Sequence, residues 1–223
     1  MLVTIAGAHG KIARLLTPQL VARGDRVRGV IRNPDHASDV EADGAEPVVC
    51  DLEHATDDEV DAAVAGTDAI VFAAGAGPGS GAARKWTVDH GAARKLVDAA
   101  TRLGIRRYVM VGAMGTDDPP QDDEVFSVYL RAKAQADDDL RAVGLDHTIV
   151  RPGGLVDDPA QGRVAVGRPV ARGSIPRADV AALIAAVLPE PASYGRTFEL
   201  VEGDMPIDEA LAVIEALPPD GGR

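Results

Sequence analysis

The stretch Leu2–Ala13, which runs Leu-Val-Thr-Ile-Ala-Gly-Ala-His-Gly-Lys-Ile-Ala, decides the fold of this chain. Its first five residues form a short apolar run with β-branched side chains, and such a run predicts a buried parallel strand. A glycine turn follows, and apolar residues then recur at spacings of three and four as far as Val21, which predicts a helix. Arg23-Gly24 provides a helix-ending signal.

The turn between this strand and this helix has the spacing Gly7-x-x-Gly10-x-x-Ala13. Gly7 permits a tight turn, and Gly10 leaves room for a pyrophosphate against the backbone, where helix N–H groups bind its charge. We therefore expect a dinucleotide to contact Gly7, His9, Gly10, Lys11 and Ile12. The alternatives are a tight turn without a ligand and, for Lys11, a side chain that faces water.

The rest of the chain repeats the alternation of strand and helix. Strands are expected at 26–31, 45–50, 69–73, 107–111, 147–151 and 197–201, and helices at 57–65, 88–103, 128–143, 178–188 and 207–217. This order predicts an α/β fold, a three-layer, doubly wound parallel sheet, in a single domain over residues 1–223. We expect residues from about 153 to form a small C-terminal lobe on the substrate side, and residues 218–223 to be a frayed end.

Composition narrows the classes of function. Acidic residues outnumber basic ones by 35 to 23, a net charge of −12, which argues against nucleic-acid binding. Cys50 has no second cysteine to pair with, so we expect a core residue and a reducing cytoplasm. The chain start is too short an apolar run for a signal peptide or membrane span, and the scattered histidines predict no metal site. We expect a monomer or homodimer with a small-molecule substrate.

Three strand ends are candidates for the rest of a cofactor site. Arg32 ends the second expected strand, about 20 residues past the glycine turn, where an acid would suit NAD and an arginine fork suits a 2′-phosphate. Asp51-Leu52 follows the third strand, and the carboxylate could accept from an adenine amino group or instead cap the next helix. Ala73-Ala74-Gly75 would leave room for a ribose. For Arg32 the alternative is a solvated side chain at a strand end. For residues 75–81 the alternative is a loose surface loop.

A Tyr-x-x-x-Lys spacing carries the strongest chemical signal. Residues four apart on a helix share a face, so the Tyr129 hydroxyl and the Lys133 ammonium are expected to converge. A neighbouring cation lowers the pKa of a phenol, which suits tyrosine to proton transfer, and Lys133 would also hold a cofactor ribose. The alternative is a tyrosine that packs beneath an exposed lysine.

Taken in order, these residues resemble the short-chain dehydrogenase/reductase superfamily, and more closely its atypical, NmrA-like and flavin-reductase-like branch of NAD(P)-binding proteins. The motifs are Gly7-x-x-Gly10-x-x-Ala13, Val30-Ile31-Arg32-Asn33-Pro34, Ala73-Ala74-Gly75, Val88-Asp89-His90-Gly91, Tyr129-x-x-x-Lys133 and Thr148-Ile149-Val150-Arg151-Pro152-Gly153. The resemblance implies a Rossmann fold with catalytic residues Tyr129 and Lys133. It also implies that Pro152, Gly153 and Leu155 lie against the nicotinamide. Arg32, with no acid at its strand end, predicts a preference for NADP(H), with NAD(H) possible.

Two departures from the family pattern bear on activity. The family serine would follow the fifth strand, where this chain has Gly112-Ala113 and no hydroxyl until Thr116, and Asp89 stands where the wider superfamily has asparagine. The resemblance favours an oxidoreductase that reduces a small carbonyl, quinone or flavin-like acceptor. The alternatives are a non-catalytic NADP(H)-sensing protein and, third, a sugar-nucleotide epimerase. Trp86, Met114 and Phe126 are candidates for a substrate-pocket wall or for ordinary packing.

Overall fold

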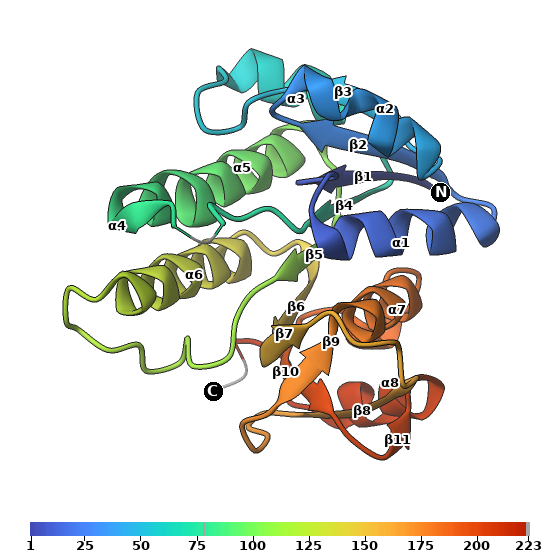
Figure 1. Ribbon diagram of the computed structural model, residues 1–223, viewed down its shortest axis with the longest axis vertical. Helices are drawn as coiled ribbons and strands as arrows, with labels where there is room; N and C mark the ends of the chain where they lie inside the picture. The colour runs from blue at the N-terminus through green and yellow to red at the C-terminus, as the bar shows by residue number, and fades with distance from the viewer. Residues whose placement is uncertain (78, 222–223) are drawn as a thin grey trace.

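A nine-stranded sheet forms the centre of the computed structural model, which describes residues 1–77 and 79–221 (Figure 1). The strand order is β11-β8-β10-β6-β5-β4-β1-β2-β3. The strands are β1 (Leu2–Ala6), β2 (Arg26–Ile31), β3 (Glu46–Val49), β4 (Ala69–Phe72), β5 (Arg107–Val111), β6 (Asp146–Pro152), β8 (Arg163–Gly167), β10 (Arg196–Glu202) and β11 (Met205–Pro206). All neighbouring pairs from β3 to β10 are parallel. The predicted doubly wound α/β sheet is confirmed.

Helices cover both faces of this sheet (Figure 1). One face carries α1 (Lys11–Ala22), α7 (Arg177–Val187) and α8 (Ile207–Ala216), and the other carries α3 (Asp57–Val64), α5 (Ala93–Leu103) and α6 (Val125–Ala142). The shorter helical segments are η1 (Pro34–His36), α2 (Ala37–Ala42), α4 (Gly81–Arg84), η2 (Lys85–Ala92) and η3 (Pro191–Ser193). Each face has its own buried cluster of mostly Val, Ile, Leu and Ala, because burial of these apolar side chains drives the layers together.

The chain preceding α5 departs from the expected single helix at 88–103. Here α4 leads into η2, an eight-residue π-helix, before the α-helix begins at Ala93. The wider turn of a π-helix is often found at functional sites. In this protein it buries Lys85 and Asp89, while Val88 and Ala92 line the cavity described below.

The C-terminal third contains strands that the sequence analysis missed. β7 (Gly154–Val156) pairs with β9 (Ser174–Pro176) in a separate two-stranded sheet, while β8 and β11 extend the main sheet in antiparallel fashion. β10 lies parallel to β6, so much of this region continues the central sheet. These strands are short, and their partners are distant in sequence, so local periodicity gave little sign of them.

The expected frayed end is wrong for residues 218–221. The Asp220 carboxylate, with its side chain 3% exposed, contacts His147 Nε2 at 3.0 Å and accepts from Arg168 Nη1 at 2.8 Å. It also accepts from the Thr197 hydroxyl at 2.5 Å, and its backbone N–H donates to Gly195 O. These bonds fasten the end of the described chain to the start of β6 and β10. Residues 222 and 223 lie outside the described part.

Candidate functional site

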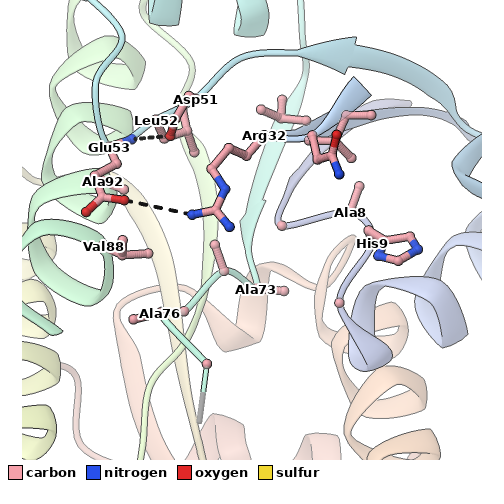
Figure 2. Close-up of a pocket in the computed structure, with 18 of the residues that line it drawn as sticks. Ala8, His9, Arg32, Asp51, Leu52, Glu53, Ala73, Ala76, Val88 and Ala92 are labelled. Atoms are coloured by element: carbon pink, nitrogen blue, oxygen red, sulfur yellow. Dashed lines mark hydrogen bonds and ion pairs between the residues drawn. The ribbon is translucent and has the colours of Figure 1, made fainter. Parts of the chain in front are cut away.

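A cavity of about 430 Å³ opens at the carboxyl ends of β1, β2 and β4 (Figure 2). Strand order reverses between β1 and β4, because the chain winds to β2 and β3 on one side and to β5 and β6 on the other. Such a switch point leaves a crevice where open α/β sheets bind ligands. Nine of the residues that we predicted for a cofactor line this cavity: Gly7, His9, Gly10, Arg32, Asp51, Leu52, Ala73, Ala74 and Gly75.

The glycine turn forms a cradle at one side of the cavity. Gly7 has a φ of +78°, and a Cβ added there would lie 2.7 Å from Ala74 Cα, so both conformation and space require glycine. Gly10 is the N-cap of α1, and no side chain caps this helix. Its first-turn N–H groups and the positive end of its dipole therefore suit an anion. The cradle fits the pyrophosphate of a nicotinamide dinucleotide.

Arg32 extends from the end of β2 into the cavity (Figure 2). Its side chain is 57% exposed, and Nη1 lies 3.9 Å from Glu53 Oε2. Glu53 is already held by Arg84 at 2.8 Å and by the Thr87 hydroxyl, and these bonds lower the pKa of its carboxyl. The position of the Glu53 carboxylate therefore depends little on Arg32. The guanidinium of Arg32 is able to turn toward a bound anion.

Asp51 lies on the cavity wall and does not cap the following helix. Thr56 is the N-cap of α3, where it forms a capping box with Glu59, so the helix-cap alternative for Asp51 is wrong. One Asp51 oxygen accepts from the Glu53 backbone N–H at 3.1 Å, and the other lies 2.9 Å from His54 Nδ1. The other lone pairs of Asp51 are available to a ligand.

The loop after β4 is anchored where it meets the cavity. Asp89 accepts a hydrogen bond from the Ala76 backbone N–H at 3.2 Å, and Lys85 Nζ donates to Gly77 O at 2.8 Å. Both side chains come from the π-helix and are buried. The alternative of a loose surface loop is therefore wrong for 75–77, while position 78 lies outside the described residues.

Six predicted cofactor residues lie outside the cavity lining: Lys11, Ile12, Lys133, Pro152, Gly153 and Leu155. Lys11 is 65% exposed and pairs with Asp157, which follows β7, while Ile12 belongs to the buried core. Gly153 packs so closely that an added Cβ would lie 2.3 Å from Gly173 O. Their contacts with a cofactor remain predictions.

Tyr129 and Lys133 occupy the same helix, α6, in contrasting surroundings. Lys133 is buried, and its Nζ donates to Val111 O at 3.0 Å and lies 3.7 Å from Asp89 Oδ1. Burial lowers the pKa of Lys133. Burial, with Asp89 and Asp137 nearby, raises the pKa of Tyr129 well above its usual value. The expectation that a cation lowers this pKa is therefore wrong for the structure, in which the phenol stays protonated at neutral pH.

Gly112 and Ala113 follow β5, where the family serine is expected, and the structure gives a packing reason for the glycine. A Cβ at Gly112 would lie 3.2 Å from both Arg151 Cγ and Asp137 Oδ1. Arg151 and Asp137 are buried and joined by a 2.9 Å bond between Nε and Oδ2. A serine side chain would press on this ion pair. The first hydroxyl after β5, on Thr116, donates to Ala113 O at 3.1 Å.

The three candidates for a substrate wall lie outside the cavity lining. Phe126 is 66% exposed at the start of α6, and its ring lies 5.8 Å from that of Tyr129. Trp86 is 42% exposed and packs edge-on against His90, while Met114 is half-buried. Phe126 therefore adjoins a predicted catalytic residue.

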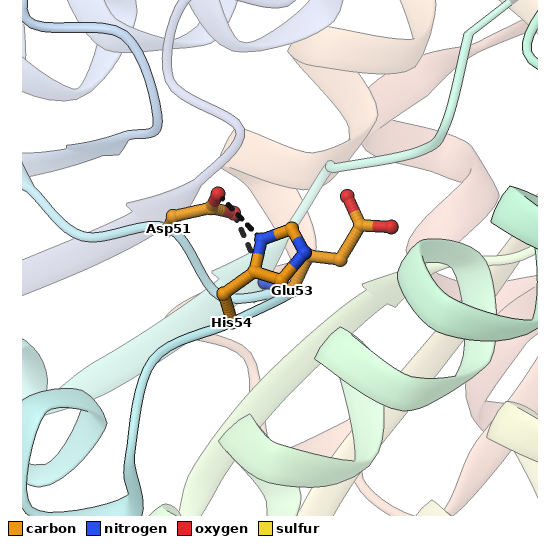
Figure 3. A group of neighbouring side chains, drawn as sticks. All are labelled: Asp51, Glu53 and His54. Atoms are coloured by element: carbon orange, nitrogen blue, oxygen red, sulfur yellow. Dashed lines mark hydrogen bonds and ion pairs between the residues drawn. The ribbon is translucent and has the colours of Figure 1, made fainter.

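Asp51, Glu53 and His54 form a group of metal-binding residue types beside the cavity (Figure 3). Their potential ligand atoms lie within 4.8 Å of one another. Glu53 is already held by Arg84 and Thr87, and His54 by Asp51. We assign no metal to this group, because binding one would cost these bonds.

Several lining residues were not anticipated: Asn33, His36, Glu53, Arg84, Val88 and Ala92. Asn33 and His36 directly follow Arg32 in sequence, so the strand end carried a signal for them. The cavity brings Glu53 together with Arg84 and Val88, which lie about thirty residues later in the sequence. No local pattern predicts such a contact.

A family model for NAD(P)H-binding proteins matches residues 7–191. The chain belongs to this NAD(P)H-binding family. The match begins at the first glycine of the cradle and includes every residue that lines the cavity. It confirms the resemblance to the atypical short-chain dehydrogenase/reductase group and the expected binding of a nicotinamide cofactor.

Relatives of this NAD(P)H-binding chain match more than nine tenths of its length. It is 39% identical to "Uncharacterized sugar epimerase YhfK" of Bacillus subtilis, covering 95% of this chain and 99% of the relative. It is also 39% identical to a solved structure, "Putative NAD-dependent epimerase/dehydratase from Bacillus halodurans", with a TM-score of 0.89 over 97% of this chain and 100% of the other. ChuY, an anaerobillin reductase from Escherichia coli, is 27% identical with a TM-score of 0.77 over 92% and 98%.

Among residues 1–77 and 79–221, no helix combines the length and the apolar character that a bilayer span requires.

Proposed function

We propose that this protein is an NADP(H)-dependent oxidoreductase that reduces a small carbonyl, quinone or flavin-like acceptor. The observation that carries the proposal is the cavity in which Gly7, Gly10 and the uncapped start of α1 meet Arg32. Backbone N–H groups bind a pyrophosphate, and a guanidinium fork suits a 2′-phosphate. We infer a single domain, 1–223, a cytoplasmic location, and residues from about 153 closing the substrate side.

The residues of the chain would share the work as follows. A bound nicotinamide supplies the hydride. Gly7 and Gly10 hold the phosphates, and Asp51 and Ala73–Gly75 border the adenosine. Tyr129, kept protonated by burial, is the proton donor to the reduced acceptor. A pKa far above the working pH makes a slow acid, so acceptors such as quinones and flavins, which need little proton assistance, suit this site best.

Lys133 would act in this scheme as a positioning residue. Its Nζ is bound to Val111 O and lies beside Asp89, which in turn holds Ala76 on the cavity wall. Lys133 thus connects α6 to the loop after β4. A direct contact between Lys133 and a cofactor ribose would require Nζ to leave these partners.

A second candidate is a protein that binds NADP(H) and signals to a partner without chemistry. It is favoured by Gly112, which stands where a serine would polarise a carbonyl, and by the engagement of Lys133 within the protein. A sugar-nucleotide epimerase is a third candidate, in line with the name of the Bacillus subtilis relative.

The deciding experiment combines binding with turnover. Calorimetric titration with NADPH and NADH is followed by NADPH oxidation against a panel of carbonyls, quinones and flavins. Tight NADPH binding with turnover of at least one acceptor supports the oxidoreductase. Tight binding without turnover on any acceptor favours the sensor, and failure to bind either dinucleotide contradicts both.

A further inference from the structure

Two of the four lysines in this chain lie near Tyr129. Lysine occurs only at positions 11, 85, 95 and 133, among 23 basic residues in all. Lys133 lies one turn after Tyr129 on α6, and Lys85 comes from the π-helix that packs against α6. The Lys85 Nζ atom is 5.5 Å from the centre of the Tyr129 ring, within the range of a cation–π contact. The predicted proton donor therefore has a second lysine beside it.

The two ammonium groups differ in their partners. Lys133 Nζ donates to Val111 O at 3.0 Å and forms an ion pair with Asp89 at 3.7 Å. Lys85 is 8% exposed, donates to Gly77 O at 2.8 Å and, within the described part of the chain, forms no ion pair. An ammonium has three N–H donors, and a buried charge without a counter-charge is costly. Lys85 therefore has the capacity to bind an anionic oxygen.

Lys85 is able to leave its backbone partner. The Gly77 carbonyl also accepts a hydrogen bond from the Ser80 hydroxyl at 2.9 Å, so this carbonyl stays bonded when Lys85 turns away. The same loop keeps its bond from the Ala76 backbone N–H to Asp89. The lysine side chain has a flexible four-carbon stem. The loop therefore does not depend on Lys85 alone, and the ammonium can turn toward a molecule bound at Tyr129.

The residues that follow β5 leave the acceptor oxygen without a polarising group. Gly112 and Ala113 carry no hydroxyl, and the Thr116 hydroxyl donates to Ala113 O. Negative charge develops on the oxygen of a carbonyl or quinone during hydride transfer, and a donor placed beside that oxygen lowers the barrier. We propose that Lys85 is a catalytic residue that binds the acceptor oxygen as this negative charge develops. The proposal rests on the proposed function, because NADPH is the reductant.

The electrons and the proton balance with these groups. The acceptor carbon gains the hydride of NADPH, and the π electron pair of the C=O bond moves to the oxygen. The Lys85 ammonium stabilises this oxyanion until the Tyr129 hydroxyl gives it a proton, and solvent returns a proton to the phenolate. Lys133 keeps its place between Val111 and Asp89 throughout. One lysine thus binds the substrate, and the other positions the surrounding elements.

The test is single-turnover oxidation of the protein–NADPH complex by a graded series of one acceptor type, such as para-substituted benzaldehydes or substituted benzoquinones. Lys85→Met should lower the rate with electron-rich members by about 10²–10³-fold, the usual loss for one oxyanion donor. Electron-poor members stabilise the oxyanion themselves and should lose less. The rate should therefore depend more steeply on electron withdrawal in Lys85→Met than in the wild type, while the NADPH dissociation constant from calorimetry is unchanged.

Further variants separate the charge of Lys85 from its hydrogen bond to the loop. Lys85→Gln keeps a donor for Gly77 O but removes the charge, so it should lose rate as Lys85→Met does. Lys85→Arg keeps the charge and should recover part of the rate. Ser80→Ala removes the other bond to Gly77 O and is the matched control, with the wild-type rate and slope expected. Thermal melting verifies that each variant is folded.

The results distinguish the role of Lys85 from the function on which it rests. Wild-type rates in both Lys85→Met and Lys85→Gln overturn the role of Lys85 and leave an NADPH-dependent reductase in place. A loss that is equal across the series, that appears as weaker NADPH binding, or that Ser80→Ala reproduces means that Lys85 holds the loop, which also overturns the proposal. A wild type that binds NADPH but reduces no acceptor contradicts the proposed function itself, and with it the role of Lys85.

Discussion

The carboxylate of Asp89 lies 3.7 Å from Lys133 Nζ, and both side chains are almost completely buried. Asp89 belongs to the π-helix and Lys133 to α6, so the pair links two elements. Asp89 also accepts from the Ala76 backbone N–H, on the loop that lines the cavity. A buried ion pair is costly to break on one side, because the remaining charge is left without a counter-charge. The position of the cavity wall therefore depends on this pair.

A double-mutant cycle measures that dependence. Lys133→Met should destabilise the fold by about 3–5 kcal/mol. The double variant with Asp89→Asn should lose less than the sum of the two single losses, by about 0.5–3 kcal/mol. Urea unfolding gives the free energies. The exposed pair Arg94–Asp98 serves as control, with a coupling of about 0.5 kcal/mol or less. Additive losses at Asp89 and Lys133 would contradict the coupling.

Arg32 should determine the choice between the two dinucleotides. Its side chain is exposed at the cavity and only weakly paired with Glu53, so Arg32→Ala should leave the melting temperature unchanged. A charge-assisted contact contributes about 1.5–3 kcal/mol, so NADPH affinity should fall roughly tenfold to a hundredfold and NADH affinity should hold. Arg102→Ala, which breaks an exposed pair with Asp61, is the control. Equal NADPH affinity in wild type and Arg32→Ala would refute this role.

A side chain at Gly10 should block dinucleotide binding. Its backbone is extended, with a φ of −70°, so any residue can adopt it, but an added Cβ would meet Gly7 O at 3.0 Å within the cradle. Gly10→Val should lose measurable NADPH binding in calorimetry, and Gly10→Ala should weaken it, with cooperative melting kept in both. Gly173→Ala, where the nearest contact would be an ordinary 3.4 Å, should bind like the wild type. Undiminished binding in Gly10→Val would place the phosphates elsewhere.

Tyr129→Phe tests the proton donor. One positioned general acid contributes about 10²–10⁴ in rate, so turnover of a carbonyl acceptor should fall by up to that order at unchanged NADPH affinity, and turnover of a quinone or flavin should fall less. The raised pKa of Tyr129 adds a pH signature: wild-type turnover should show no loss from phenol ionisation between pH 7 and about 10. Tyr108→Phe, which removes the hydroxyl of a buried tyrosine on β5, is the matched control and should keep its turnover. Full turnover in Tyr129→Phe would mean that solvent supplies the proton.

Asp220 should make the fold sensitive to acid. Its pKa is lowered to about 2, through bonds from His147 and Thr197 and the charge of Arg141. A lowered carboxyl pKa contributes stability that is complete above about pH 4 and is lost as pH falls toward about 2. Asp220→Asn should therefore cost about 1–2 kcal/mol at pH 7 and little near pH 2. Guanidinium unfolding at the two pH values measures this. Asp118→Asn, on the exposed acidic loop, should be neutral at both.

The parts of the fold that the sequence predicted are those encoded locally. Apolar runs at β1, β4 and β5 need no knowledge of their neighbours, and α5 ends at Gly104 in the left-handed conformation, as the glycine signal indicates. The short strands β7, β8 and β9 were not predicted, because their stability comes from pairing with distant segments. The anchoring of Asp220 was not predicted for the same reason, since its partners are distant in sequence.

The residues of the candidate site also separate into those with a local sequence signal and those without one. Gly7, Gly10, Arg32 and Ala73 were predicted from their place after a strand, and all four line the cavity. The engagement of Lys133 by Asp89 and Val111 could not be predicted, since the Tyr-x-x-x-Lys spacing fixes a helix face and not what packs against it. The raised pKa of Tyr129 likewise follows from burial, which only the assembled layers create.

The packing of α1 against α7 has a consequence for biosynthesis. The helix that starts at the phosphate cradle is covered by a helix from the last quarter of the chain, and Arg23 at its end donates to Ala185 O. Contacts between residues so far apart in sequence form late and slow the folding of a domain. A ribosome synthesises the cradle more than 150 residues before the helix that buries it. The growing chain thus carries its nucleotide loop on an uncovered apolar helix until α7 emerges.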